Sequence, residues 1–403
     1  MLKSYKYKLK PSEEQIALLN KHFGSIRFVY NYFLNERKKE YEINKNTINY
    51  YDNAKSLTEL KKQEEYSWLN EINSQSLQYS LKCLDGSYQN FFKFKKGFPN
   101  FKSKHSKNSF SVPQSVKLID GKLVIPKFKE PINLNLSRSF TGKIKSCTIT
   151  KTPTNEYFVS ILVETGHIKL EKTGKSIGID LGIKDFIITS DGYKYKNNRY
   201  TKKYQTLLKN AQQHLSRKNR GSNRYEKQRL KVAKIHKKIT NSRLDNLHKV
   251  STELIKKYDL IVLEDLNIKG MIKNHRLSKH ISDVSWSKFI ELLTYKAEWN
   301  DKEIVRIDRF FPSSKTCNCC GYINQNLDLS VREWTCPSCK IKLDRDLNAS
   351  INILNEGYKS LGTSDNRRGD KIRPTSVGAI GETSKTLNND IYNSESHESL
   401  VRG

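Results

Sequence analysis

Hydrophobic positions in the first hundred residues recur at helical spacing. Ser12 and Gln15 follow Pro11 with the spacing of a capping box, and apolar residues then recur every three or four positions to about residue 44. A second stretch with this spacing covers about residues 74–95. We therefore expect two long helices in this part of the chain.

The pattern changes to short alternating runs between about residues 109 and 165. Turn residues separate these runs, and the runs at 145–150 and 157–163 bracket one such turn as a hairpin. We expect a small antiparallel β domain here, with the helices of residues 11–95 attached to it.

The second half of the chain alternates strand-like and helix-like patterns. Strand-like runs occupy residues 176–180, 185–190, 259–264 and 303–308, and helical patterns occupy 201–258, 285–300 and 346–356. Such alternation is typical of an α/β domain, which we expect to begin near residue 174. Residues 360–403 are rich in Ser, Thr, Asn and Gly, and we predict a disordered tail there.

The net charge of the chain indicates what kind of partner the protein binds. It has 73 Lys and Arg against 42 Asp and Glu, a net charge of +31, and this excess is typical of proteins that bind nucleic acid. No stretch approaches the ~18 consecutive apolar residues of a membrane span, and the start has no apolar signal-peptide core. An odd count of seven cysteines fits a reducing compartment. We expect a prokaryotic cytoplasmic protein, associated with the nucleoid and with no membrane partner.

Three acidic residues stand at the ends of strand-like or helix-like segments. Asp180 and Glu264 each end an apolar run, and Asp346 lies near the start of the last helix. If the two strands are neighbours, these carboxylates gather into a site for two Mg²⁺ ions about 3.5–4 Å apart, which suits phosphodiester hydrolysis. Asp180 could instead simply end a strand before a glycine turn. Asp344 competes with Asp346 for the third role, and either could be only a helix N-cap.

Four cysteines have the spacing of a metal site. Cys317, Cys320, Cys336 and Cys339 form the pattern Cys-x2-Cys-x15-Cys-x2-Cys, which predicts one tetrahedral Zn²⁺ of structural function. Cys319 would break this spacing as a ligand, and we leave it free.

Several Arg and Lys residues are candidates for nucleic-acid contacts. On the predicted basic helices these are Arg217, Lys218, Arg220, Arg224 and Lys227, and Arg332 lies within the cysteine segment. The alternative is a solvated charged face, but an excess of one sign favours a polyanion. Residues 88–104 interleave Tyr, Phe and Lys, a pattern that suits base stacking, although for the aromatic residues alone core packing is the favoured explanation.

Taken together, these motifs resemble TnpB, a family of transposon-encoded RNA-guided nucleases related to type V CRISPR effectors. The likeness covers nearly the whole chain before the tail, and it rests on residues 5–11, 28–31, 97–104, 178–182, 263–266, 311–317 and 344–349. Residues 178–182, 263–266 and 344–349 resemble the first, second and third RuvC motifs. In the family the third acid directly precedes x-Asn-Ala, which selects Asp346. Two departures are Cys319 beside Cys320 and Ser350 where the family often has Ala.

The resemblance implies a fold of class α/β plus β. It implies an RNase H-like RuvC nuclease domain with a zinc ribbon inserted before the last helix, and an N-terminal lobe of an OB-like wedge β-barrel with inserted or flanking helices. The expected boundaries are 1–10 for the first barrel strand, 11–105 for the helical recognition domain, 106–172 for the barrel, 173–310 and 343–359 for the nuclease domain, and 311–342 for the zinc ribbon.

The resemblance also implies a function, an RNA-guided DNA endonuclease encoded by a transposon. A guide RNA from the transposon end would pair with the target DNA, and the protein would read a short flanking motif. We expect a monomer or weak dimer. Two alternatives stay open: a compact CRISPR-associated effector of the same fold, and a catalytically idle nucleic-acid-binding regulator of transposition.

Overall fold

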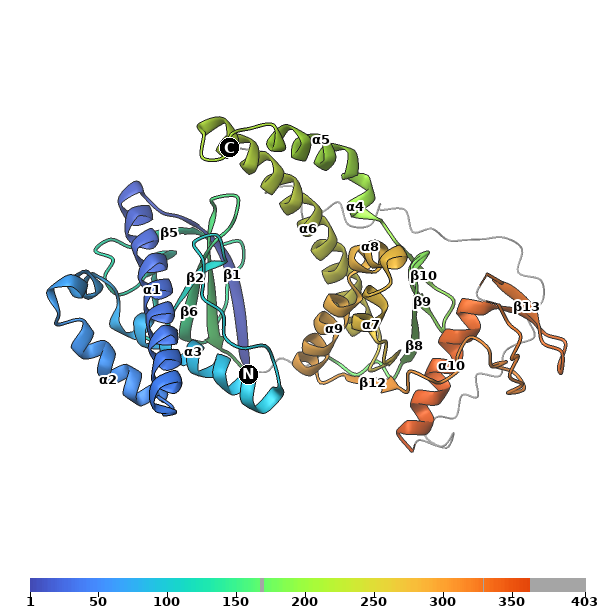
Figure 1. Cartoon of the computed structure of the whole chain (residues 1–403). Coiled ribbons are helices and arrows are strands. Elements are labelled where there is room, and N and C mark those ends of the chain that lie inside the picture. Colours follow the sequence, from blue (N-terminus) through green and yellow to red (C-terminus); the bar gives the residue numbers. More distant parts are fainter. Residues whose placement is uncertain (167–169, 329, 363–403) are drawn as a thin grey trace.

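The computed structural model describes residues 1–166, 170–328 and 330–362. Two sheets, each covered by helices, follow one another along the chain, and Figure 1 shows them side by side. The predicted disordered tail lies outside the described residues from 363 onward.

Helix α1 (Glu13–Asn44) begins at the predicted capping box. The Ser12 hydroxyl accepts a hydrogen bond from the N–H of Gln15, and the Gln15 side chain accepts one from the N–H of Ser12. Helix α3 (Ser74–Phe94) confirms the second predicted helix. Between them lie α2 (Tyr50–Leu60) and a 3₁₀ helix (Glu64–Glu71), which the periodicity did not predict.

These helices share one hydrophobic core with the first sheet. That sheet has seven strands in the order β2-β6-β7-β1-β5-β4-β3. The bounds are β1 (Leu2–Lys10), β2 (Asn108–Val112), β3 (Lys117–Ile119), β4 (Lys122–Val124), β5 (Ile132–Asn135), β6 (Lys143–Lys151) and β7 (Tyr157–Glu164). Strand β1 buries Tyr7 and Leu9 and exposes Lys6 and Lys8, the alternation of a sheet with one covered face.

Every pairing in this sheet is antiparallel, including the β6–β7 hairpin, which confirms the antiparallel β domain. Strands β2 and β3 are the two ends of the strand order in this sheet. Within the described part of the chain no ladder joins these two strands, so the hydrogen bonds form an open sheet where we expected an OB-like wedge β-barrel.

The second sheet is mixed and has five strands in the order β10-β9-β8-β11-β12. The bounds are β8 (Ser176–Leu181), β9 (Asp185–Thr189), β10 (Lys194–Lys196), β11 (Leu260–Glu264) and β12 (Glu303–Ile307). Strands β8, β9 and β10 form an antiparallel meander, whereas β11 runs parallel to both β8 and β12. Helical crossovers join the parallel strands, so the predicted α/β class of this half is confirmed.

The first crossover contains α4 (Tyr200–Lys203), α5 (Gln205–Ser216) and α6 (Asn223–Lys257). Figure 1 shows α5 and α6 as a long hairpin beside the two sheets. Lys237 of α6 forms an ion pair with Glu156, and Arg229 donates to the carbonyl of Pro153 at 3.3 Å. Because Pro153 and Glu156 belong to the β6–β7 turn, α6 connects the two sheets.

The second crossover contains α7 (Ile268–Ile272), α8 (His275–Val284) and α9 (Trp286–Asn300). The cysteine segment follows β12 and carries a two-stranded ladder of β13 (Glu333–Thr335) and β14 (Lys342–Asp344). Among the described helices, none combines the length and the apolar character needed to cross a membrane.

The last helix, α10 (Arg345–Ser360), packs directly against the second sheet because glycines lie at the contact. An added Cβ at Gly178 of β8 would lie 2.2 Å from the carbonyl oxygen of Ser350, and one at Gly357 would lie 2.5 Å from a methyl of Val262. A side chain at either position would push the helix away from the sheet. Gly178 of the 178–182 motif therefore has a packing function, because it lets α10 lie directly against the second sheet.

Candidate functional site

Asp180 and Glu264 lie at the same end of two neighbouring strands. Strands β8 and β11 are parallel, and their last paired residues are Ile179 and Leu263. Asp180 and Glu264 each follow directly, so the register brings both carboxylates to one edge of the sheet. The predicted condition that the two strands lie side by side is therefore met.

Asp346 comes to the same edge from α10, and Asp344 has a different task. The Asp344 carboxylate is the N-cap of α10: it accepts hydrogen bonds from the N–H groups of Asp346 and Leu347, each at 3.0 Å. It also pairs with Lys194 at 2.7 Å. Asp346 stands in the first helical turn, where a negative charge is favoured by the helix dipole.

The three carboxylates are close enough to influence one another. Burial raises the pKa of Asp180, the charges of Glu264 and Asp346 raise it further, and Arg345 lowers it, with a result of about 7. Burial also raises the pKa of Glu264. A carboxyl group titrating near neutrality is typical of a site that is completed by a cation.

Two side chains hold these acids in place. The Ser313 hydroxyl donates a short hydrogen bond to Glu264 Oε1. The Arg332 guanidinium pairs with Asp346 at 3.0 Å. We did not predict a role for Ser313, although it lies in the 311–317 motif, because a serine in a loop gives no indication of its partner. Arg332 was predicted to contact nucleic acid, and in this structure its partner is a carboxylate.

The donor set fits hard divalent cations. Three half-buried carboxylates from different elements offer oxygen ligands, the kind that Mg²⁺ prefers. Within the described residues, the cysteine cluster is the only group of three or more His, Cys, Asp or Glu residues whose ligand atoms all lie within 4.8 Å of one another, so the three carboxylates together are more widely spaced than that.

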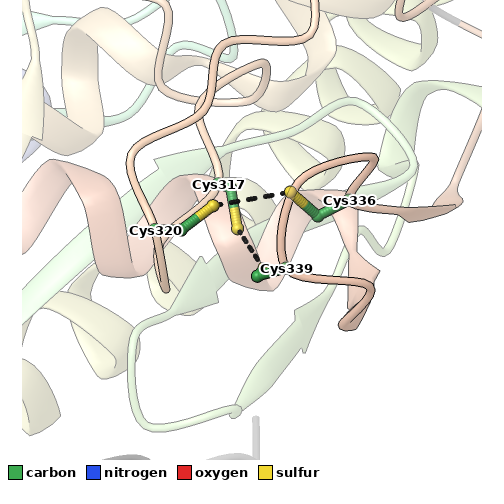
Figure 2. Close-up of side chains that lie close together, drawn as sticks. All are labelled: Cys317, Cys320, Cys336 and Cys339. Carbon is green, nitrogen blue, oxygen red and sulfur yellow. Dashed lines mark hydrogen bonds between the residues drawn. The ribbon is translucent and has the colours of Figure 1, made fainter.

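The four predicted cysteines come together. Figure 2 shows Cys317 and Cys320 facing Cys336 and Cys339 across a small gap. The Sγ atoms of Cys317 and Cys339 are 3.6 Å apart, and those of Cys320 and Cys336 are 3.5 Å apart. Four sulfurs at ~2.3 Å from a tetrahedral zinc ion are about 3.8 Å apart, so this cluster fits Zn²⁺. Cys319 is exposed and lies outside the cluster.

The two cysteine turns have the same hydrogen-bond pattern. The backbone carbonyl of Cys317 accepts a hydrogen bond from the N–H of Gly321, and that of Cys336 accepts one from the N–H of Lys340, both at 2.9 Å. Gly321 and Lys340 adopt left-handed backbone with φ of 77° and 60°. Each Cys-x-x-Cys pair is therefore presented by one tight turn.

Two asparagines fasten the cysteine segment to α10. Asn348 donates to the carbonyl of Thr316 at 2.7 Å and accepts from the N–H of Asn318 at 2.9 Å. Asn352 donates to the carbonyl of Ser313 at 2.8 Å. The same helix thus carries Asp346 and anchors the segment that provides Ser313 and Arg332. The sequence offered Asn348 only as part of the 344–349 motif, without this function.

The remaining predicted cations lie apart from the carboxylates, at the α5–α6 turn and the first turns of α6. Their side chains are exposed: Arg217, Lys218, Arg220, Arg224 and Lys227. Exposure and like charge suit contacts with phosphates, which attract cations without regard to sequence.

Three family matches cover most of the chain. The family described as "Probable transposase" matches residues 160–275, "Cas12f1-like, TNB domain" matches 286–353, and "Helix-turn-helix domain" matches 1–46. The third match spans β1 and α1.

Two curated relatives match over almost their full length, and a third matches over less than half. A Streptomyces pristinaespiralis protein named "Putative RNA-guided DNA endonuclease" is 37% identical over 92% of this chain and 92% of its own length. The Escherichia coli protein named "Putative RNA-guided DNA endonuclease InsQ" is 30% identical over 90% of this chain and 94% of its own. A mimivirus protein named "TnpB-like protein L79" is 28% identical over 51% of this chain and 42% of its own.

Among solved structures, a Cas12f1 complex with guide RNA and target DNA aligns with a TM-score of 0.36. The two chains are 15% identical, and the alignment covers 88% of this chain and 99% of the other. This likeness is too distant to assign a fold.

Proposed function

This chain belongs to the TnpB family of RNA-guided DNA endonucleases, and from that premise we propose that Asp180, Glu264 and Asp346 form its catalytic site. The protein is a transposon-associated, RNA-guided nuclease. The observation that supports the site assignment is that β8 and β11 bring Asp180 and Glu264 to one edge of the sheet, where burial and then the charges of Glu264 and Asp346 raise the pKa of Asp180 to about 7.

The proposed reaction is hydrolysis of a DNA phosphodiester bond with two Mg²⁺ ions. When bound, the ions would lower the pKa of the attacking water and stabilise the leaving oxygen. Asp180, Glu264 and Asp346 would hold them. Ser313 fixes one oxygen of Glu264, and Asp344 caps α10 so that the Asp346 carboxylate is not used for capping.

The cysteine cluster has no chemistry in this proposal. A zinc ion with four thiolate ligands has no open position for water or substrate, so we assign Zn²⁺ a structural function. Through Asn348 and Arg332, the cluster supports the part of the site that Asp346 provides.

The partners of the protein are RNA and DNA. We propose that the guide is a transcript from the transposon end, that base pairing selects the target, and that the protein reads a short flanking DNA motif. The net charge of +31 supports a large phosphate surface, to which Arg217, Lys218, Arg220, Arg224 and Lys227 would contribute. The domain boundaries given above and a monomeric or weakly dimeric state belong to this proposal.

The test begins with the RNA that copurifies when the gene is expressed with its native flanking DNA. One discrete transcript, whose constant part extends beyond the coding region, is expected and supplies the guide. The complex should then cut a matched target in Mg²⁺, whereas Asp180→Ala should bind the same RNA and cut nothing. Cleavage by Asp180→Ala would refute the site. Heterogeneous RNA and no cleavage by the wild type would favour the idle regulator.

A further inference from the structure

Phe310 is the most exposed large hydrophobic side chain in the described part of the protein, with 84% of its surface accessible. Single exposed apolar residues are common on proteins, so exposure alone assigns no function. The position and the support of Phe310 distinguish it from such residues.

Phe310 lies in the turn after β12, which is joined to the Glu264 end of β11. The N–H of Asp265 donates to the carbonyl of Ile307 at 3.2 Å. Arg309 forms an ion pair with Asp265, the residue directly after Glu264. Three residues beyond Phe310, Ser313 donates its hydroxyl to Glu264. Residues on both sides of Phe310 therefore touch the Glu264–Asp265 pair.

The turn is also held in one shape. The Asp308 carboxylate accepts a hydrogen bond from the N–H of Phe310 at 2.7 Å. The Asp308 backbone carbonyl accepts one from the N–H of Phe311 at 3.2 Å. Phe311 turns inward and packs against the cluster of Leu260, Val262, Ile307 and Ile353. Phe310 therefore stands exposed between two anchored neighbours.

Phe310 is close in the chain to Ser313, which contacts the Glu264 carboxylate, so a strand bound at the carboxylates is within reach of its ring. Three residues span at most about 10 Å, so the Cα of Phe310 cannot lie farther than this from the Cα of Ser313. A rigid aromatic ring offers a surface on which any base can stack, and such stacking does not depend on sequence. This property suits a nuclease whose specificity comes from base pairing with a guide.

We propose that Phe310 is a stacking platform for an unpaired base of the DNA strand that enters the carboxylate site. The inference rests on the proposed function and adds a positioning residue to it. Stacking there fixes the register of the strand, so that one phosphate lies at the carboxylates when the metal ions are bound. Arg309 pairs with Asp265 and keeps 43% of its side chain exposed, so the ring, at 84%, is the more exposed of these two contacts.

The test uses the guide RNA complex with a matched target. Phe310→Ala should lower the single-turnover cleavage rate about 5- to 100-fold, the range that corresponds to the loss of one stacked base. It should also spread the cut over neighbouring phosphates, as mapped from the product ends. Phe310→Tyr should retain both the rate and the cut position, whereas Phe310→Leu, which is apolar but not flat, should behave like Phe310→Ala.

A second readout does not depend on cleavage. In the Asp180→Ala background, a fluorescent adenine analogue at successive DNA positions should be quenched at one position near the expected cut, and Phe310→Ala should restore its emission. Labels on either DNA strand identify which strand is bound. Quenching that depends on Phe310 only for labelled guide RNA would overturn the inference.

Controls separate this inference from the proposed function. Ile43→Ala removes an apolar side chain of similar exposure, 77%, at the end of α1 and should change neither rate nor cut position. If wild type cuts, Asp180→Ala does not and Phe310→Ala equals wild type, the nuclease assignment stands and the Phe310 inference fails. If wild type cuts no matched target, both fail together.

Discussion

One guanidinium nitrogen of Arg332 donates to both carboxylate oxygens of Asp346, at 3.0 and 3.3 Å. Arg332 directly precedes β13 in the cysteine segment, and its carbonyl accepts a hydrogen bond from the N–H of Arg345 at the start of α10. The cysteine segment and the third acid are thus joined by side chain and by backbone. A cation that neutralises Asp346 here is well placed to contact a phosphate that approaches the same carboxylate.

We predict that Arg332→Ala lowers the cleavage rate about 10- to 100-fold, the usual cost of losing one charge-assisted contact of ~1.5–3 kcal/mol. Binding of the guide RNA should not change, because the pair lies away from the basic helices. Arg332→Lys should retain part of the rate, since it keeps the positive charge on a side chain of different length and shape. Cleavage as fast as wild type by Arg332→Ala would mean that the pair only stabilises the fold.

Asp180→Asn should abolish cleavage and at the same time stabilise the metal-free protein. Burial together with Glu264 and Asp346 raises the pKa of Asp180 to about 7, above its unfolded value of about 3.9, so ionising it costs stability as the pH rises between these values. Asparagine removes that cost. In Mg²⁺-free buffer at pH 8, which leaves the zinc site loaded, we expect a melting temperature at least about 2–4 °C above wild type, the shift that roughly 1 kcal/mol produces. No increase at pH 8, or the same increase at pH 4, would contradict this explanation.

The cysteine cluster provides a matched pair of substitutions. Cys336→Ser removes a fully buried sulfur from the cluster, and Cys319→Ser removes an exposed sulfur outside it. We expect Cys336→Ser to lose the single zinc ion and at least about 3 kcal/mol of stability, because metal binding is coupled to folding. Metal analysis and thermal unfolding measure the two effects. Cys319→Ser should keep both zinc and stability, and loss of zinc in that variant would place Cys319 among the ligands.

Elements with a strong periodic pattern were predictable from the sequence, and side-chain partners were not. The capping box at Ser12 and Gln15 locates the start of α1, because capping is a local interaction. The partner of Ser313 is Glu264, 49 residues away, and no local pattern encodes such a contact. Asp344 caps α10 and Asp346 does not; the spacing of the residues left these two roles open, and only the family resemblance selected Asp346. The open edge of the first sheet likewise depends on long-range pairing that periodicity does not contain.

The exposed cations at the α5–α6 turn should contribute to the salt dependence of RNA binding. Replacing Arg217, Lys218, Arg220, Arg224 and Lys227 by Gln, one at a time, removes at most one phosphate interaction in each variant. Where a substitution removes such an interaction, the slope of log K against log salt should fall by about one, with little effect on the cut position. Lys288→Gln is a control, since that exposed lysine pairs with Glu291 on α9. Slopes equal to wild type in all five variants would show that this face is only solvated.

Glu156 links the two halves of the molecule and makes their contact sensitive to acid. Its carboxylate pairs with Lys8 of β1 and with Lys237 of α6. Burial raises the pKa of Glu156, but hydrogen bonds from Lys237, Thr154 and Lys8 outweigh this effect and bring the pKa to about 2. Since this is below the unfolded value of about 4.3, the stabilisation is complete above pH 5 and is lost as the pH falls toward 2.

Glu156→Gln should therefore weaken the contact between α6 and the β6–β7 turn at neutral pH, by about 1 kcal/mol for a partly exposed network. The difference in unfolding free energy between wild type and Glu156→Gln should shrink as the pH is lowered from 5 to 3. Hydrogen exchange at the β6–β7 turn reports the same contact locally. Glu291→Gln is the control, because Glu291 pairs only with Lys288 of its own helix, α9, among the ion pairs of the described residues. A difference for Glu156→Gln that stays constant between pH 7 and pH 3 would show that the stabilisation does not come from the ionised carboxylate.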